Sequence, residues 1–418
     1  MKRTIKLAVV AAIALSSTAA FATNGDHLIG LGAKARGMGG VGIGMSHGAE
    51  SALANPALIT SVTGTEVSFG GTIFMPDVKN NLNVGMADTK STADLSVIPE
   101  VAIAQKSSDN FYWGIGMFGV AGMGTDYANK PANFNMQTNL QLMQFAVPLA
   151  YKSNGFSIGI APVLQYGSLD INYAGTLDTS SAFAGGMAPA NSAAVSTGKG
   201  VAQDFGFGYN VGAAYEVSDL TIGASYKSAI DMVYRNQLTG ALSDFHKFGI
   251  LTNINTDNLE QPAEIGVGTS YKIGGSTIAI DYKQIKWADA KGYKDFGWEN
   301  QNVLIFGYQF AQDNWALRAG YNHAKNPIKE QNGMTPNGAA LNMFNLLGFP
   351  ATVESHYTLG GSYAISKMTS FDLAYMYAPE VTNTYSMAAF GGFGPMNPTS
   401  ITTKHSQSSA SMQLNFKF

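Results

Sequence analysis

The chain ends on a ten-residue stretch, SASMQLNFKF, in which apolar and polar side chains alternate without a break. One face carries the apolar residues Ala410, Met412, Leu414, Phe416 and Phe418. A period of two residues is the pattern of a β-strand that separates apolar from polar surroundings. The same period recurs in DNWALRAGYN, TSFDLAYMYA and STIAIDYK. The dominant pattern therefore predicts an all-β protein.

The first residues have the organisation of a secretory signal peptide. A positively charged start (MKRTIK) precedes a short apolar core at 7–15 and an A-x-A cleavage site at 20–22. A membrane-anchor helix is the alternative, but the core is too short to span a bilayer and polar residues soon interrupt it. We expect residues 1–22 to be removed during export through the general secretory pathway.

The amino-acid composition excludes several classes of function. The absence of Cys excludes disulfides and thiolate metal sites, and the net charge of -3 argues against nucleic-acid binding. The six histidines lack the spacing of a zinc helix, and no G-x-S-x-G nucleophile motif stands out. We therefore expect no metal, no cofactor and no enzymatic activity. With only 13% charged residues and no long apolar run after residue 22, a soluble β-protein or an outer-membrane barrel remains.

The connections between the expected strands favour the barrel. Short turns such as SSDN, SNG and AQDN alternate with long segments at 169–202, 232–257 and 325–351, which is the asymmetry of an outer-membrane barrel. An even number of strands places both termini on the short-turn side. Residues 64–418 are expected to form about 14 antiparallel transmembrane strands. Their approximate positions are 64–75, 93–105, 109–120, 137–152, 154–168, 203–217, 218–231, 258–273, 274–287, 299–311, 313–324, 352–366, 367–380 and 404–418.

Residues 23–63 lack this alternation and are expected to plug the lumen as a hatch, because a barrel of this size is too wide for wall side chains to fill. The stretch GMGGVGIG contains a literal G-x-G-x-x-G, but no buried strand precedes it, so a dinucleotide site is not supported. Its glycines allow close backbone packing. Asn55 is a candidate helix N-cap, with Pro56 at the first helical position. The expected hatch residues are Gly37, Gly39, Gly40, Gly42, Asn55 and Pro56.

The stretch LGAKARGMGGVGIGMSHGAESALANPALIT resembles the N-terminal hatch of the FadL/TodX (OMPP1) family of outer-membrane transporters. QDFGFGYNVGAAYE, QPAEIGVGTSYKI and FPATVESHYTLGGSYAIS also resemble strands of that family. The resemblance implies a 14-stranded, hatch-plugged barrel that passes long-chain fatty acids or related hydrophobic molecules inward by passive diffusion. It also implies a kinked third strand through which ligand leaves sideways. GIGMFGVAGMG at 114–124, with Gly119 and Gly122, is the corresponding segment, although ordinary strand glycines beside the hatch are an alternative interpretation.

Two loop segments, LNMFNLLGFP and FHKFGIL, are unusually apolar for an exposed rim and predict a capture surface. They could also pack on one another as a lid. Movement of the expected mature N-terminus, 23–26, would then open a path toward the third strand. The candidate ligand contacts are Thr23, Asn24, Phe118, Phe245, Phe248, Lys291, Arg318, Phe344 and Leu347.

The sequence does not identify the cargo. The resemblance implies basic residues at strand or loop positions around the pocket, but LQYGSLDINY, which corresponds to one such position, has neither Arg nor Lys. Lys286, Lys291, Lys294 and Arg318 are the remaining cations, although Arg318 and Glu264 also fit ion pairs inside the barrel and the lysines a solvated loop. Long-chain fatty acids, aromatic or other hydrocarbons, and a surface adhesion or receptor role without transport are therefore the alternatives.

The expected partners follow from this architecture. We expect a monomer in the Gram-negative outer membrane, in contact with outer-membrane lipids and lipopolysaccharide, with a hydrophobic small-molecule ligand and no nucleic acid. The terminal Phe418 resembles the signal read by the barrel-assembly machinery.

Overall fold

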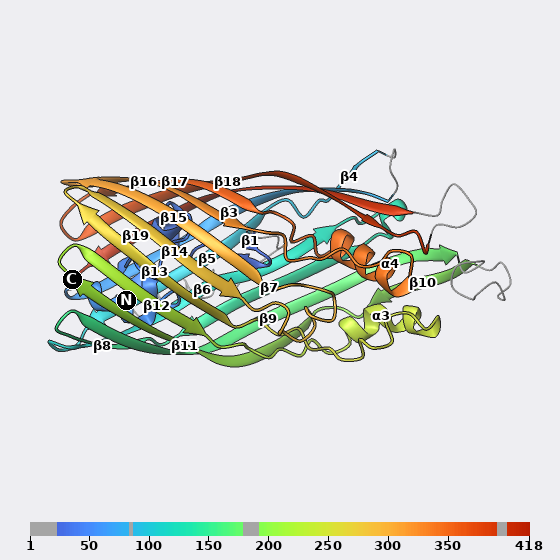
Figure 1. The fold of residues 1–418 in the computed structure, drawn as a ribbon, viewed down its shortest axis with the longest axis horizontal. Helices are drawn as coiled ribbons and strands as arrows, with labels where there is room; N and C mark the ends of the chain where they lie inside the picture. Colours follow the sequence, from blue (N-terminus) through green and yellow to red (C-terminus); the bar gives the residue numbers. More distant parts are fainter. Residues whose placement is uncertain (1–22, 83–86, 179–191, 391–398) are drawn as a thin grey trace.

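The computed structural model describes residues 23–82, 87–178, 192–390 and 399–418. The predicted signal peptide lies outside these residues, as does part of the predicted loop 169–202. Within the described residues, fourteen antiparallel strands form a closed barrel when β7 with β8, and β10 with β11, are each counted once (Figure 1). They are β3 (Thr65–Asn81), β5 (Ser96–Lys106), β6 (Phe111–Asp126), β7 (Gln137–Ala146) with β8 (Leu149–Ser153), β9 (Phe156–Asp178), β10 (Ser192–Gly198) with β11 (Ala202–Val217), β12 (Leu220–Lys227), β13 (Glu264–Ile273), β14 (Ser276–Ile285), β15 (Gln301–Gln312), β16 (Trp315–Ala324), β17 (Ser355–Ala364), β18 (Thr369–Ser386) and β19 (Ser400–Lys417).

The last strand closes the barrel on the first. β19 pairs with β3 from Thr402↔Asn81 to Lys417↔Glu66, and Phe418 exchanges two backbone hydrogen bonds with Thr65. Figure 1 shows the C-terminus at the end of the barrel that carries the short turns. The predicted strands and the short-turn end are therefore confirmed.

Some strands are longer than predicted. β9 has 23 residues, and β18 and β19 have 18 each, whereas about 9–11 residues suffice for a membrane crossing. The prediction of a loop from residue 169 is wrong, since β9 continues to Asp178 and pairs with β10. Beyond the membrane both faces of a strand meet water or loops, so the alternation that marks a spanning strand fades.

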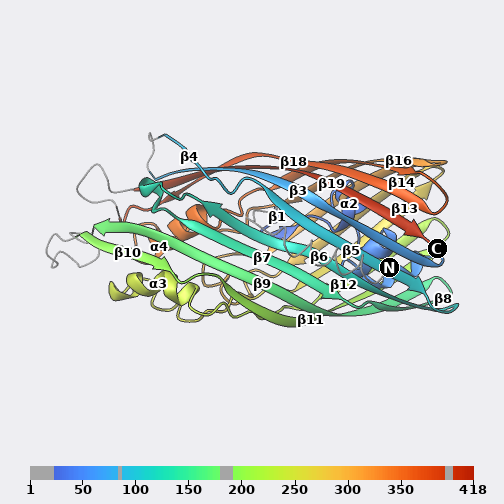
Figure 2. The same ribbon diagram turned by 180° about the vertical axis from the view of Figure 1, so that it is seen from behind.

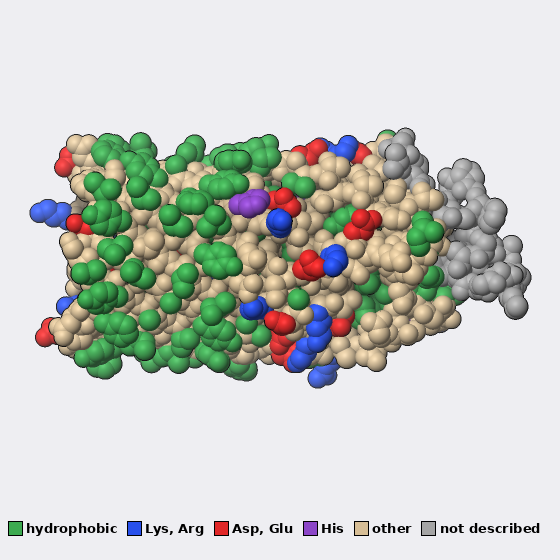
Figure 3. All heavy atoms as spheres, viewed as in Figure 1, with side chains coloured by type: hydrophobic (Ala, Val, Ile, Leu, Met, Phe, Trp, Pro, Cys, Tyr) green, Lys and Arg blue, Asp and Glu red, His purple; other side chains and the backbone are tan. Residues whose placement is uncertain are grey.

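Outward-facing side chains form an apolar belt. Leu373, Tyr375 and Tyr377 on β18 are exposed, whereas Ala374 and Met376 between them are buried, which confirms the two-residue period of TSFDLAYMYA. Figure 3 shows hydrophobic side chains covering the short-turn half of one face and charged side chains gathering beyond it. The belt is the membrane-facing surface of the barrel.

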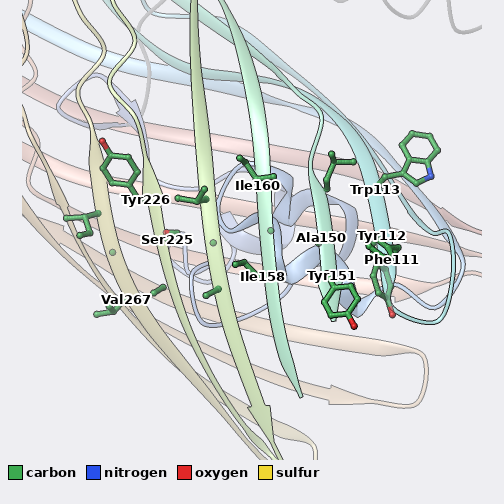
Figure 4. A pocket seen from close by; sticks show the side chains of 18 of the residues that line it. Phe111, Tyr112, Trp113, Ala150, Tyr151, Ile158, Ile160, Ser225, Tyr226 and Val267 are labelled. Atoms are coloured by element: carbon green, nitrogen blue, oxygen red, sulfur yellow. The ribbon is translucent and has the colours of Figure 1, made fainter. Parts of the chain in front are cut away.

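A shallow apolar groove of about 1060 Å³ lies on this outer wall, across β6, β8, β9 and β11 to β13 (Figure 4). Its rim includes Phe111, Tyr151, Ile158, Ile160, Tyr226 and Val267. These belong to the outward-facing set, so the groove faces lipid and is separate from the lumen.

Residues 23–63, hereafter the inner segment, lie inside the barrel. In Figures 1 and 2 this part of the chain is enclosed by the strands, toward the short-turn end. Its elements contact the inner faces of β5, β6, β8, β9, β11 and β17 to β19. Asn55 caps η2 by accepting a hydrogen bond from the Ala57 backbone N–H at 3.1 Å, and Pro56 begins that helix. The elements are β1 (Thr23–Asn24), β2 (His27–Leu28), α2 (Gly32–Arg36), η1 (Gly48–Ala52) and η2 (Pro56–Ser61).

The remaining short elements lie in the long connections. Figure 1 shows α3 and α4 at the end of the barrel opposite the short turns. None of the helices in the described ranges has the length and apolar character needed to span a membrane. The elements are β4 (Thr89–Lys90), η3 (Pro131–Asn133), α3 (Leu238–Lys247), α4 (Pro336–Met343) and η4 (Phe344–Gly348).

Candidate functional site

The glycine-rich stretch binds a carboxylate of the barrel wall. The backbone N–H groups of Gly42, Ile43 and Gly44 donate to Asp281 on β14 at 2.7, 2.8 and 3.1 Å. Asp281 is fully buried. Successive backbone N–H groups make an anion-binding concavity, and here the anion comes from the wall itself. The stretch thus fixes the inner segment to β14.

Two other glycines of the stretch lie against wall backbone. A Cβ atom at Gly37 would lie 3.0 Å from the Gly360 Cα, and one at Gly39 would lie 2.8 Å from the Tyr321 carbonyl oxygen. Gly39 also has a φ of 72°, a left-handed conformation that disfavours other residues. Side chains at these positions would push the inner segment off β16 and β17.

Helix α2 is fixed to the wall by charge. Arg36 pairs with Glu100 and donates to Thr72 at 2.6 Å, and the Lys34 amino group lies 3.1 Å from Glu50 and 3.7 Å from Asp372. Burial raises the pKa of Glu50 to about 7, against the opposing effect of Lys34. Burial disfavours the Lys34 charge, but the surrounding carboxylates outweigh it and raise the pKa of that amine. Breaking these pairs would leave charges buried without partners, which is costly.

The pairing of the third barrel strand, β6, with its neighbour β5 ends where the resemblance expected a kink. The β5–β6 ladder runs from Lys106↔Tyr112 to Glu100↔Phe118 and ends there, although β5 continues along β3 as far as Ser96. On the other edge of β6 the register shifts between Gly119 and Ala121, which is a β-bulge. Beyond Phe118, β6 therefore separates from β5.

The N-terminal hairpin occupies the edge that β5 leaves. β1 and β2 pair with each other, His27 pairs with Ala121, and the Gly122 N–H donates to the Asp26 carbonyl at 3.0 Å. Since β7 covers the other edge of β6, the hairpin lies on the β5 side. Thr23 and Asn24 are thereby brought close to the Gly119–Gly122 stretch of β6, inside the barrel.

A polar cluster lies around this hairpin. Asp26 accepts hydrogen bonds from the Tyr293 hydroxyl and, at 3.3 Å, from the Gln261 side-chain amide. Burial raises the pKa of Asp26, and burial together with Asp26 raises that of Tyr293. His27 lies 2.7 Å from Glu264 and 2.6 Å from the Gln261 Oε1. The hairpin is thus bound through polar groups rather than through apolar packing alone.

Two lysines that the sequence analysis did not select complete the cluster. The Lys283 and Lys227 amino groups lie 3.1 and 3.5 Å from the same carboxylate oxygen, Oε2 of Glu264. Lys227, Lys283 and Glu264 border a small cavity of about 50 Å³ together with the apolar Leu28 and Val120. One carboxylate therefore balances two amino groups next to apolar lining.

Aromatic rings pack against the hairpin turn. Trp287, Tyr293 and Trp298 meet pairwise with ring centroids 4.7 to 5.0 Å apart. A Cβ at Gly25 would lie 2.5 Å from the Trp287 ring, so the hairpin turn rests directly on the indole. Withdrawal of the hairpin would expose an aromatic surface to the lumen.

The apolar loops form a lid rather than an exposed rim. Phe245 on α3 and Phe344 on η4 are buried, with ring centroids 5.2 Å apart, and both contact Tyr173 of β9. Leu347 is fully buried and its carbonyl accepts from Thr125 of β6 at 2.8 Å. The expectation of exposed apolar side chains was wrong here, because these residues find partners in one another. Phe248 packs at the edge of the same cluster.

Two of the remaining predicted cations, Lys291 and Arg318, pair with acids other than Glu264. Lys291 is exposed and pairs with Asp231 at 2.6 Å. Arg318 is buried in the wall, where it donates to Gln309 at 2.8 Å and lies 3.9 Å from Asp372. The ion-pair interpretation of Arg318 and Glu264 is therefore confirmed. Phe118 is buried at the point where β5 and β6 separate.

A family model described as outer membrane protein transport protein (OMPP1/FadL/TodX) matches residues 7–418. The chain belongs to this family. The OMPP1/FadL/TodX family consists of transport channels rather than enzymes, and both family and barrel fold indicate a Gram-negative outer-membrane protein. A search of curated proteins found no match.

Solved structures share the fold at low sequence identity. A Pseudomonas aeruginosa FadL homologue superposes with a TM-score of 0.68 at 16% identity, over 94% of this chain and 100% of that chain. The Pseudomonas putida toluene transporter TodX gives 0.66 at 18% identity, over 93% and 99%. The Ralstonia pickettii toluene transporter TbuX gives 0.64 at 17% identity, over 93% and 99%. At this identity the likeness supports the barrel fold and leaves the cargo open.

Proposed function

We propose that this OMPP1/FadL/TodX family member takes up long-chain fatty acids by passive diffusion, with the inner segment as a hatch and a lateral exit between β5 and β6. The observation that carries the proposal is the hairpin 23–28, which lies along β6 where β5 has separated. Moving this hairpin would uncover the gap in the wall and vacate the part of the lumen next to β6. The buried lid of α3, α4 and η4 would also have to open for entry.

A carboxylate-bearing cargo is supported by Lys227 and Lys283. Their shared counter-ion, Glu264, leaves a surplus of positive charge beside the apolar Leu28 and Val120. A fatty-acid head would reduce that surplus while its chain contacts the apolar lining. A second candidate cargo is an aromatic hydrocarbon, which the rings of Trp287, Tyr293 and Trp298 favour.

The hairpin can be locked chemically. His27 and Ala121 are directly paired across antiparallel strands, and such pairs have Cβ atoms about 4.5–5.5 Å apart, which is near the range for a disulfide. The chain has no cysteine of its own. We expect the oxidised His27→Cys with Ala121→Cys variant to lose uptake in proteoliposomes and to regain it on reduction.

Each single-cysteine variant is the control for the loss of the native side chain. Uptake is measured separately with a radiolabelled long-chain fatty acid and with toluene, so the two arms identify the cargo class. Full uptake by the oxidised double variant, with the disulfide verified by mass spectrometry, would rule out the hairpin as the gate.

A further inference from the structure

The pairing register of the outer wall leaves a depression in the apolar belt. Ala213 on β11 pairs directly with Ala224 on β12, and both residues line the groove on the outer wall. Tyr215 and Ile222, two residues further along each strand, are exposed. Since side chains two residues apart share a face of a strand, the two alanines also face outward. Two methyl groups therefore lie side by side at the floor of the groove.

Larger apolar side chains surround these two alanines. On the neighbouring strands, Ala213 pairs with Ile158 of β9, and Ala224 pairs with Val267 of β13. Each of these partners has more carbon atoms than alanine and extends further from the wall. The side chains that complete the ring along β11 and β12 are Val211, Tyr215, Ile222 and Tyr226. The wall of the barrel, which is convex as a whole, is thus concave at this place.

Aromatic contacts hold the two sides of the groove in position. The rings of Phe111 on β6 and Tyr151 on β8 meet edge to face with their centroids 5.2 Å apart. On the other side, Tyr226 packs against Tyr209 with ring centroids 6.1 Å apart. Figure 4 shows Phe111 and Tyr151 close together on one side of the groove and Tyr226 on the other. Because ring pairs of this geometry are favourable in themselves, the groove is formed before anything enters it.

The position of the groove along the strands decides which lipids it meets. The turn between β11 and β12 begins at Ser218, five residues after Ala213. At about 3.3 Å per residue and a strand tilt of about 40°, Ala213 lies about 13 Å from that turn along the membrane normal. This depth falls in the half of an about 30 Å hydrocarbon core that is nearer the short turns. Short turns of an outer-membrane barrel face the periplasm, and the periplasmic leaflet consists of phospholipids.

We propose that the groove is a binding site for an acyl chain of a phospholipid in the periplasmic leaflet. The groove is continuous with the membrane-facing belt, so lipid already covers the surface around it. A flexible chain that enters the groove gains dispersion contacts with the alanine floor, which an empty groove would forfeit. A second copy of the barrel would present a convex wall, which would rest on the surrounding ring and leave the alanines uncovered.

The test measures lipid bound to the delipidated protein in detergent by native mass spectrometry. The protein is titrated with phosphatidylethanolamine and, separately, with lipopolysaccharide, and the spectrum also reports the oligomeric state. We expect saturable binding of phosphatidylethanolamine to the monomer. Replacing both floor residues, Ala213→Phe with Ala224→Phe, should weaken this binding about tenfold or more, since the loss of about ten dispersion contacts corresponds to that factor. The rings fill the groove from outside, so the barrel should keep its heat-resistant migration on gels.

Ala319→Phe is the matched control. Ala319 lies on β16 two residues from the exposed Leu317, faces outward in the same way, and does not line the groove. This variant should bind phosphatidylethanolamine like the wild type. If the double variant does not assemble, Tyr226→Ala removes one side of the groove instead and should also weaken binding.

Three results would overturn the inference. The first is no saturable binding of phosphatidylethanolamine by the wild type, and the second is equal binding by the wild type and the groove variants. The third is preferential binding of lipopolysaccharide, or a wild-type dimer that the double variant converts to a monomer, since either would assign the groove to a different occupant.

Discussion

Glu264 is the residue on which three cationic or potentially cationic side chains converge. Its Oε1 faces His27 and its Oε2 faces Lys227 and Lys283. Inside a barrel such a carboxylate has two roles: it supplies both lysines with a counter-ion away from bulk water, and it links them to the hairpin. Cargo recognition and gating are therefore connected through one side chain.

This arrangement predicts the effect of Lys283→Met. Removing one amino group should raise the fatty-acid concentration that gives half-maximal uptake about tenfold or more, since a hydrogen bond to a charged group contributes about 1.5–3 kcal/mol. Glu264 keeps Lys227 and His27, so the wall should remain folded. Toluene uptake should be unchanged, and Lys291→Met, which removes only an exposed pair with Asp231, serves as the control. An equal loss of uptake for fatty acid and toluene would mean that Lys283 supports the structure without binding the cargo carboxylate.

Sequence patterns could not identify Lys227 and Lys283. Each is an ordinary inward-facing polar residue on its strand, which is what any barrel lumen contains. Only the register between β12, β13 and β14 brings them to the same glutamate. The loop cation Lys291 was easier to notice and is solvent-exposed instead.

At the scale of elements, the spanning strands were predictable and the inner segment was less so. Alternation of apolar and polar residues located all the wall strands because lipid and lumen impose it directly. The loss of β5 pairing along β6 has no such signature: glycines at 114–124 only permit a bulge, and its place depends on where β5 separates. In the same way, glycines predicted close packing of 37–42 but could not indicate Asp281 as the partner of the following amides.

Asp281→Ala tests whether this contact holds the inner segment. Three buried N–H groups, from Gly42, Ile43 and Gly44, would lose their acceptor, and each unsatisfied group costs about 1–3 kcal/mol. The barrel should keep its heat-resistant migration on gels, because its closed hydrogen-bond network is independent of the inner segment. Conductance in planar bilayers should rise.

Asp281→Asn is the matched control for that experiment. It retains one carbonyl oxygen in place of the carboxylate, so the rise in conductance should be smaller than for Asp281→Ala. If both variants conduct like the wild type, the glycine-rich stretch is held by its backbone packing against β16 and β17 alone.

For the whole molecule, the described residues form a closed state. The lid covers one end of the lumen, the inner segment fills the other, and the hairpin covers the gap beside β6. The sequence predicted the barrel and its short-turn end, because both follow from strand count and loop length. It left open which of the two loop arrangements is present, since an apolar loop fits a capture surface and a lid equally. The mutual packing of Phe245 and Phe344 shows that these loops form a lid.

Phe418 has two separable features, its backbone hydrogen bonds to the first barrel strand and its exposed side chain. The Phe418 N–H donates to the Thr65 carbonyl at 2.9 Å, and the Thr65 N–H donates to the Phe418 carbonyl at 3.1 Å, while Phe418 as a residue is 71% exposed. Phe418→Ala keeps both backbone bonds and removes only the ring. If the ring is a signal for the barrel-assembly machinery, this variant should reach the outer membrane in lower yield yet refold normally from urea into detergent. Phe418→Trp, which keeps a terminal aromatic, should be inserted like the wild type. Normal membrane yield of Phe418→Ala would show that the backbone bonds alone suffice for assembly.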